Sequence, residues 1–123
     1  MRDPDQFMLV SENEDGIDGF MCVSFGSPDP VGGYADTEIS TLYVQPRHHG
    51  KGIGKLLLEA AFQKCRTQGV DAVWLATNAE NDPAIAFYQA QGFQQVGETY
   101  FSIDDQRYLN NVYVYRLDDV SAG

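Results

Sequence analysis

Three glycines, Gly50, Gly52 and Gly54, alternate along a short segment that also carries basic side chains. At the start of a helix, a glycine-rich turn lets backbone N–H groups converge on an anion, and the helix dipole favours negative charge there. These residue types at this spacing therefore indicate a phosphate-binding turn. A tight strand-to-helix turn without a ligand would use the same glycines and remains the alternative.

Two common phosphate-binding patterns do not fit this segment. The dinucleotide fingerprint requires glycine at the sixth position from Gly50, where the chain has Lys55. The P-loop requires Ser or Thr after Gly-Lys, but Leu56 follows Lys55, and His49 occupies the place of the first P-loop glycine. Neither kind of nucleotide site is predicted.

A metal site is the other chemistry that this segment suggests, because His48 and His49 are adjacent. No Cys or His lies at a suitable spacing to join them, and the carboxylates lie elsewhere in the sequence. We expect no metal and interpret both histidines as loop residues near a phosphate.

Hydrophobic periodicity predicts the elements around the turn. Alternation over residues 38–44 predicts a strand that enters the turn, and an apolar stripe from Ile53 to Cys65 predicts a helix that ends at Gly69. Asp82-Pro83 is a typical helix start, so a second helix is expected over residues 84–91. Further strands are expected over residues 7–10, 20–25, 72–77, 93–103 and 112–117, with loops over 26–35 and from Asp104 to as far as Asn111.

This order of elements predicts an α+β fold. It combines an antiparallel beginning, a central strand–loop–helix–strand unit and an antiparallel end. With 123 residues, no repeat and no linker, we expect one domain over residues 1–123.

Charge is unevenly distributed along the chain, whose net charge is −10. Residues 41–69 carry five basic residues and one acid, whereas the segments on either side are strongly acidic. This basic island predicts a polyanionic ligand, and the acidic remainder predicts a cationic partner, although acidic surfaces also simply maintain solubility. The overall balance argues against nucleic acid as the main partner.

The sequence favours a reduced, cytoplasmic protein. No apolar run approaches the roughly 20 residues of a membrane span, and the first residues lack a signal-peptide pattern. Cys22 and Cys65 are too few for a disulfide scaffold.

Two motifs resemble the signatures of the GNAT N-acetyltransferase superfamily. Residues 47–54, Arg-His-His-Gly-Lys-Gly-Ile-Gly, resemble its acetyl-CoA signature, Gln/Arg-x-x-Gly-x-Gly/Ala, after a strand. Residues 81–93 resemble its second signature, with Asn81 seven residues before Tyr88 and Gly-Phe at the helix end. The resemblance covers residues 7–117 and implies a mixed, mostly antiparallel, twisted GNAT-like sheet with acetyl-CoA as the acetyl donor.

The resemblance also implies roles for individual residues. The backbone of Leu42, Tyr43 and Val44 would pair with the pantetheine arm where two strands splay, and Asn81 would hydrogen-bond that arm. Their alternative roles are an ordinary core strand and a loop cap. Backbone N–H groups would hold the coenzyme A pyrophosphate along Arg47, His48, His49, Gly50, Lys51, Gly52, Ile53, Gly54 and Lys55.

Two side chains are candidates for proton transfer. By resemblance, Tyr88 is the general acid that reprotonates the departing thiolate, with a packed tyrosine as the alternative. An acceptor ammonium has no lone pair and must lose a proton before it attacks. The resemblance implies that a carboxylate on the central strand takes this proton, directly or through water, and Glu38 is the candidate base, with water itself as the alternative base. A solvent-facing position for Glu38 is the alternative, because Asp36 and Ser40 share its face.

The expected activity is acetyl transfer from acetyl-CoA to a primary amine by direct attack in a ternary complex. Residues 97–106 resemble bacterial polyamine acetyltransferases, which implies a small polycationic acceptor. The chain begins too close to its first strand for the family's usual N-terminal strand and helices. Either the sequence lacks that part of the protein, or this is a shortened member whose acceptor side is open or completed by a second subunit, as in a homodimer. A protein or peptide N-acetyltransferase and a non-catalytic acyl-CoA-binding or regulatory domain remain alternatives.

Overall fold

A computed structural model gives the fold of the chain and describes residues 6–14, 16–45 and 52–117. The described elements, in chain order, are β1 (Gln6–Asn13), β2 (Gly16–Phe25), β3 (Thr37–Val44), α1 (Ile53–Thr67), β4 (Ala72–Asn78), α2 (Asp82–Ala90), β5 (Gln94–Ile103) and β6 (Gln106–Arg116).

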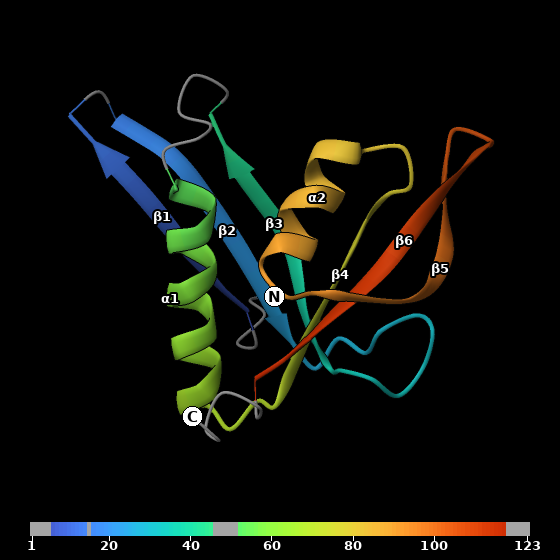
Figure 1. The fold of residues 1–123 in the computed structure, drawn as a ribbon, viewed down its shortest axis with the longest axis horizontal. Coiled ribbons are helices and arrows are strands. Elements are labelled where there is room, and N and C mark those ends of the chain that lie inside the picture. Colours follow the sequence, from blue (N-terminus) through green and yellow to red (C-terminus); the bar gives the residue numbers. More distant parts are fainter. Residues whose placement is uncertain (1–5, 15, 46–51, 118–123) are drawn as a thin grey trace.

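The strands form one open sheet in the order β1-β2-β3-β4-β6-β5 (Figure 1). Every neighbouring pair is antiparallel except β3 and β4, which are parallel and are joined along the chain through α1. The α+β prediction, with a mostly antiparallel sheet and a central strand–loop–helix–strand unit, is confirmed.

The parallel pair is short. Strands β3 and β4 share one register pair, Glu38 with Trp74, whereas β4 pairs with β6 along its whole length from Ala72 to Asn78. Beyond Glu38 the two parallel strands therefore diverge, and the sheet opens toward the carboxyl end of β3 (Figure 1).

Both helices lie on the same face of the sheet (Figure 1). Their apolar side chains join one core cluster with inward residues of β2, β3, β4 and β6, because α1 presents a continuous apolar stripe to the sheet. On the opposite face, a smaller cluster contains Ala35, Ala72, Trp74, Val112 and Val114. No helix of the described residues covers that face.

The loop between β2 and β3 covers part of the opposite face. The buried carboxylate of Asp29 organises it by accepting backbone N–H bonds from Gly32, from Tyr34 at 2.8 Å and from Ala35 at 2.9 Å. Burial by itself raises the pKa of Asp29, but these backbone hydrogen bonds outweigh burial, so the pKa lies below its ordinary value. The predicted loop over 26–35 is thus a fixed part of the fold.

Three expected strand boundaries are wrong. Strand β1 continues to Asn13 rather than ending near residue 10, and β2 begins at Gly16 rather than at residue 20. The last strand begins at Gln106 rather than near residue 112, and the loop expected to reach Asn111 is a turn formed by Asp104 and Asp105. Both aspartates have positive φ, 50° and 69°, as a two-residue type I′ hairpin turn requires. The polar residues that follow the turn are paired with β5, which the sequence pattern did not reveal.

Candidate active site

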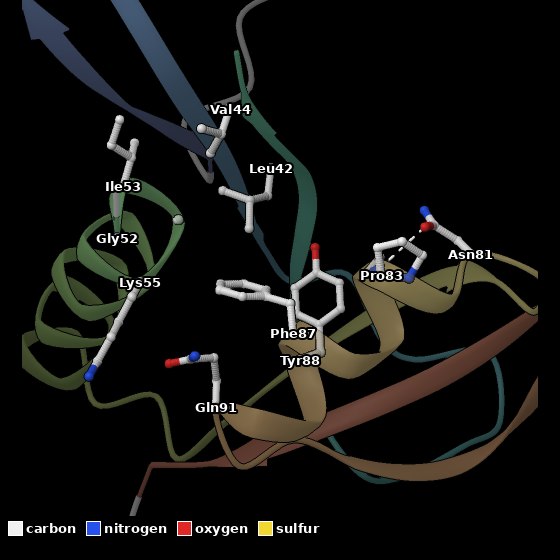
Figure 2. A pocket seen from close by; sticks show the side chains of 12 residues that line it. Leu42, Val44, Gly52, Ile53, Lys55, Asn81, Pro83, Phe87, Tyr88 and Gln91 are labelled. Atoms are coloured by element: carbon white, nitrogen blue, oxygen red, sulfur yellow. Dashed lines mark hydrogen bonds between the residues drawn. The ribbon is translucent and has the colours of Figure 1, made fainter. Parts of the chain in front are cut away.

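A cavity of about 560 Å³ lies between the carboxyl end of β3 and the first turns of α1 and α2 (Figure 2). This volume is within the range of small-molecule sites. The lining residues are Leu42, Val44, Gly52, Ile53, Gly54, Lys55, Asn81, Pro83, Ala84, Phe87, Tyr88 and Gln91. The structure therefore brings the two sequence motifs, nearly thirty residues apart, to one site.

The amino end of α1 has backbone donors that no side chain of the described residues caps. Gly52 is the N-cap residue in a left-handed conformation with φ of 79°, and the first turn contains no acidic residue. The first intrahelical bond runs from Leu56 N to Gly52 O at 3.0 Å, so the N–H groups that precede Leu56 have no acceptor within the helix. These donors and the helix dipole make this end of the cavity suitable for an anion.

The amino end of α2 is different, although it lines the same cavity. The Asn81 side chain accepts a bond from the Ala84 backbone N–H at 3.3 Å, and Asp82 contributes negative charge to the first turn. Asn81 therefore has the cap role that was the alternative to binding the pantetheine arm, and its side chain also lines the cavity, so the predicted contact with that arm stays a prediction. Because its oxygen is engaged, the group that Asn81 can offer a ligand is its amide nitrogen.

Gly54 brings the two helices close together. A Cβ atom at this position would lie 3.1 Å from Cζ of Phe87, so a larger residue would push α1 away from α2. Phe87 packs against the core and lines the cavity as well. Gly52 and Gly54 therefore serve different purposes, a left-handed turn and a close helix contact.

Tyr88 directs its hydroxyl from α2 toward β3 (Figure 2). Its ring is half-buried and makes edge contacts with Phe87 at 5.4 Å and with Phe93 at 5.5 Å between ring centroids. Burial raises the pKa of the phenol above its ordinary value of 10.0, so Tyr88 keeps its proton at neutral pH. The site thus holds a fixed hydroxyl donor.

Glu38 lies on the other side of the sheet. Its neighbour Ile39 belongs to the helix-side core, so strand alternation directs Glu38 to the opposite face, beside its register partner Trp74. Its half-buried carboxylate accepts a hydrogen bond from Ser27 Oγ at 2.9 Å. Glu38 does not line the cavity, but it stands at the point where β3 and β4 begin to diverge.

The remaining predicted site residues divide into two groups. Leu42 and Val44 line the cavity, whereas the Tyr43 side chain is exposed and contacts Phe20, with ring centroids 5.5 Å apart. The predicted phosphate-loop residues Arg47, His48, His49, Gly50 and Lys51 lie outside the described residues.

The cavity-facing stripe of α2 was not predicted from the sequence. Ala84 and Gln91 line the cavity on the same helical face as Tyr88, and Pro83 and Phe87 border them. The spacing from Ala84 to Tyr88 to Gln91 is the i, i+4, i+7 pattern of one helix face. That pattern was available in the sequence, but mixed polar and apolar residues hid it.

The described residues were also compared with the requirements of a metal site and of a membrane-spanning helix. Among the described residues, no group of three or more His, Cys, Asp or Glu side chains is arranged to hold a metal ion. No helix in the described part of the chain is long and apolar enough to cross a membrane.

Comparison with known proteins identifies the family. The Acetyltransferase (GNAT) family profile matches residues 1–93. The chain is 35% identical to N-acetyltransferase 8 of Rattus norvegicus over 75 residues, 61% of this chain and 34% of that protein. It is 33% identical to streptothricin acetyltransferase of Streptomyces lavendulae over 97 residues, 78% of this chain and 49% of that protein. The chain thus spans about a third to a half of these curated relatives.

Solved structures give the same result. The crystal structure of nourseothricin acetyltransferase superposes with a TM-score of 0.78 at 26% identity, covering 93% of this chain and 66% of that one. An acetyltransferase from Thermus thermophilus has a TM-score of 0.72 at 26% identity, with the same two coverages. The fold, the site and the family profile agree, and the chain belongs to the GNAT acetyltransferase family.

Proposed function

We propose that this protein transfers the acetyl group of acetyl-CoA to a primary amine. The observation that carries the proposal is the cavity that joins three features: the amino end of α1, which no described side chain caps, the diverging end of β3 and the Tyr88 hydroxyl. These three features match three parts of the donor: its phosphates, its extended pantetheine arm and its thioester.

The donor would bind mainly through backbone groups. The first turn of α1 supports a role in holding the pyrophosphate, with Lys55 adding positive charge at the cavity wall. The divergence of β3 from β4 supports pairing of the pantetheine amides with β3 near Leu42 and Val44, as an added strand would pair. Asn81 would donate its amide N–H to the same arm.

The proton-transfer groups approach the reaction from opposite faces of the sheet. Glu38, directly or through a water, would take a proton from the acceptor ammonium, and the freed lone pair would attack the thioester carbonyl. The C–S bond then breaks, and Tyr88 would donate a hydrogen bond and finally its proton to the departing sulfur. The nitrogen, positively charged after its attack, would release its second proton to water, and solvent would return a proton to the Tyr88 phenolate. Burial raises the pKa of Tyr88, but the same low-dielectric site also raises the proton affinity of the thiolate.

Direct attack is favoured over an acyl-cysteine intermediate. Cys65 is fully buried in the core cluster, and burial raises the pKa of its thiol to about 11, despite the lowering effect of Arg66 and Lys64. Cys22 is a half-buried free cysteine on β2 and does not line the cavity. An acyl-cysteine intermediate would need a cysteine thiolate that faces the cavity, and neither Cys22 nor Cys65 lines it.

The test is release of coenzyme A thiol from acetyl-CoA in the presence of a panel of primary amines, with the full-length chain. We expect amine-dependent thiol release and a matching acetylated amine by mass spectrometry. Acetyl-CoA binding measured by calorimetry, without thiol release for any amine or peptide, would instead establish a non-catalytic acyl-CoA-binding domain.

For the acceptor, we propose a small polycationic amine such as spermidine. The chain has a net charge of −10 although the donor-binding segment is basic, so the remaining surface attracts cations. The exposed Asp104-Asp105 turn places two of these carboxylates at the end of the β5–β6 hairpin. A protein or peptide amine is the competing acceptor and belongs in the same panel.

Electrostatic attraction of a polycation predicts a salt effect. We expect kcat/KM to fall with ionic strength more steeply for spermidine than for a monoamine of similar length, because screening acts on each additional charge. Steady-state rates at several NaCl concentrations measure both slopes. Equal slopes would remove the polyamine assignment and leave a general amine acetyltransferase.

We also propose that the protein works in a reducing compartment such as the cytoplasm, and its cysteines support this. Both Cys22 and Cys65 are free, and Cys65 is packed as an apolar core residue.

A further inference from the structure

Three residues from separate parts of the chain meet where β3 and β4 begin to diverge. Ser27 Oγ donates to Glu38 Oε1 at 2.9 Å, and Trp74 Nε1 donates to the Ser27 carbonyl oxygen at 2.7 Å. Glu38 and Trp74 are the single register pair of the two parallel strands. Ser27 therefore bridges both strands at the last point where they are joined.

The Ser27 main chain is held from two sides. Its N–H donates to Asp36 O at 2.7 Å, which closes the loop between β2 and β3, and its carbonyl accepts the Trp74 bond. The buried Asp29 carboxylate fixes the middle of the same loop through its backbone bonds. Because the backbone of Ser27 is fixed, its hydroxyl reaches Glu38 from a constant position.

A glutamate carboxylate on a strand has several rotamers, and fixing one of them requires a bond from outside the strand. Glu38 is half-buried, and its bond to Ser27 occupies Oε1. The second oxygen, Oε2, is then the one presented to a ligand that approaches from the face opposite the helices.

We propose that Ser27 is a positioning residue for Glu38 in acetyl transfer, holding Oε1 so that Oε2 accepts the proton of the acceptor amine. This inference rests on the proposed function and on Glu38 as its base. In the transfer the N–H bond breaks, the proton moves to Oε2, and the electron pair stays on nitrogen for the attack. Ser27 keeps its own proton throughout.

The first test is Ser27→Ala. We expect kcat to fall about 10–100-fold, the range for loss of a hydrogen bond to a charged group, with little change in the KM for acetyl-CoA, because the donor cavity lies on the other face. Ser27→Thr retains a hydroxyl and should recover most of the rate. Ser40→Ala is the matched control, since Ser40 lies on the same strand as Glu38 but its Oγ bonds to Cys22 O at 3.4 Å.

Two further measurements distinguish positioning of Glu38 from a purely structural role of Ser27. Trp74 is the single tryptophan of the chain, so an unchanged emission spectrum in Ser27→Ala shows that the loop still contacts β4. In a Glu38→Gln background, Ser27→Ala should add little further loss, because residues that act through one group are not additive.

The outcomes separate the inference from the function on which it rests. If the wild type acetylates amines, two results overturn the positioning role alone. One is a normal kcat in Ser27→Ala; the other is a double variant in which the kcat losses of Ser27→Ala and Glu38→Gln multiply. Normal kcat in Glu38→Gln overturns it as well and leaves acetyl transfer standing. A wild-type chain without activity toward any amine would refute the proposed function and the positioning role together.

Discussion

Replacing Tyr88 with phenylalanine is expected to lower kcat by about 10²–10⁴-fold, the usual contribution of a general acid. The change removes one hydroxyl, while the ring keeps its contacts with Phe87 and Phe93. Affinity for acetyl-CoA should change little, because the proposed binding groups for the donor are backbone groups of α1 and β3. Single-turnover rates, which isolate the chemical step, and calorimetry of coenzyme A binding measure the two effects separately.

Tyr115→Phe is the matched control for this variant. Its ring lies 5.4 Å from Phe93, in the same aromatic cluster as Tyr88, but Tyr115 does not line the cavity. We expect Tyr115→Phe to keep the wild-type kcat. Equal losses in the two variants would show that Tyr88 contributes only packing.

The raised pKa of Tyr88 also predicts a pH dependence. Burial favours the protonated phenol, so Tyr88 remains a proton donor from pH 7 to pH 9, below its ordinary pKa of 10.0. From pH 7 to pH 9 the single-turnover rates of the wild type and of Tyr88→Phe should therefore depend on pH in the same way. A fall that disappears in Tyr88→Phe would mean that Tyr88 ionises in this range and that burial does not control its pKa.

The order of elements and the existence of the site could be predicted from sequence because both depend on local patterns. The helical stripe that begins at Ile53 and the Asp82-Pro83 start identified both helices, and the structure has them within a residue or two of the expected places. The glycine spacing also placed the start of α1 beside Gly52, which is its N-cap residue. Each of these features is determined by residues close to one another in the chain.

Features that depend on contacts between distant segments could not be predicted. The start of β6 at Gln106 depends on pairing with β5, which its polar residues did not indicate. The need for glycine at position 54 comes from the ring of Phe87, on another helix. Similarly, the bond from Ser27 to Glu38 joins a loop to a strand and has no local pattern.

Gly52 and Gly54 were both explained from the sequence by one phosphate-binding turn, but they have separate roles in the structure. Gly52 is required by a left-handed backbone, so a side chain there is strained even though a Cβ atom would meet nothing within 4 Å. That open space faces the cavity, because Gly52 lines it. A substitution at Gly52 therefore affects folding through the backbone and binding through the ligand, and a test must separate the two.

Gly52→Ala is expected to weaken coenzyme A binding by about 100-fold or more. The added methyl group would occupy the space from which a phosphate approaches the N–H groups of the first turn, and each lost bond to a charged group is worth about 1.5–3 kcal/mol. Alanine in a left-handed conformation also costs about 1–2 kcal/mol of stability. Calorimetric titration with coenzyme A and thermal unfolding measure the two effects.

Gly69→Ala supplies the control, because Gly69 has the same φ of 79° and the same absence of atoms within 4 Å of a Cβ. It follows the carboxyl end of α1 and does not line the cavity. Backbone strain should therefore lower the melting temperature of both variants by similar amounts, while only Gly52→Ala loses affinity. Equal affinity in the two folded variants would mean that the amino end of α1 does not hold the phosphates, and the donor would have to bind without the helix dipole.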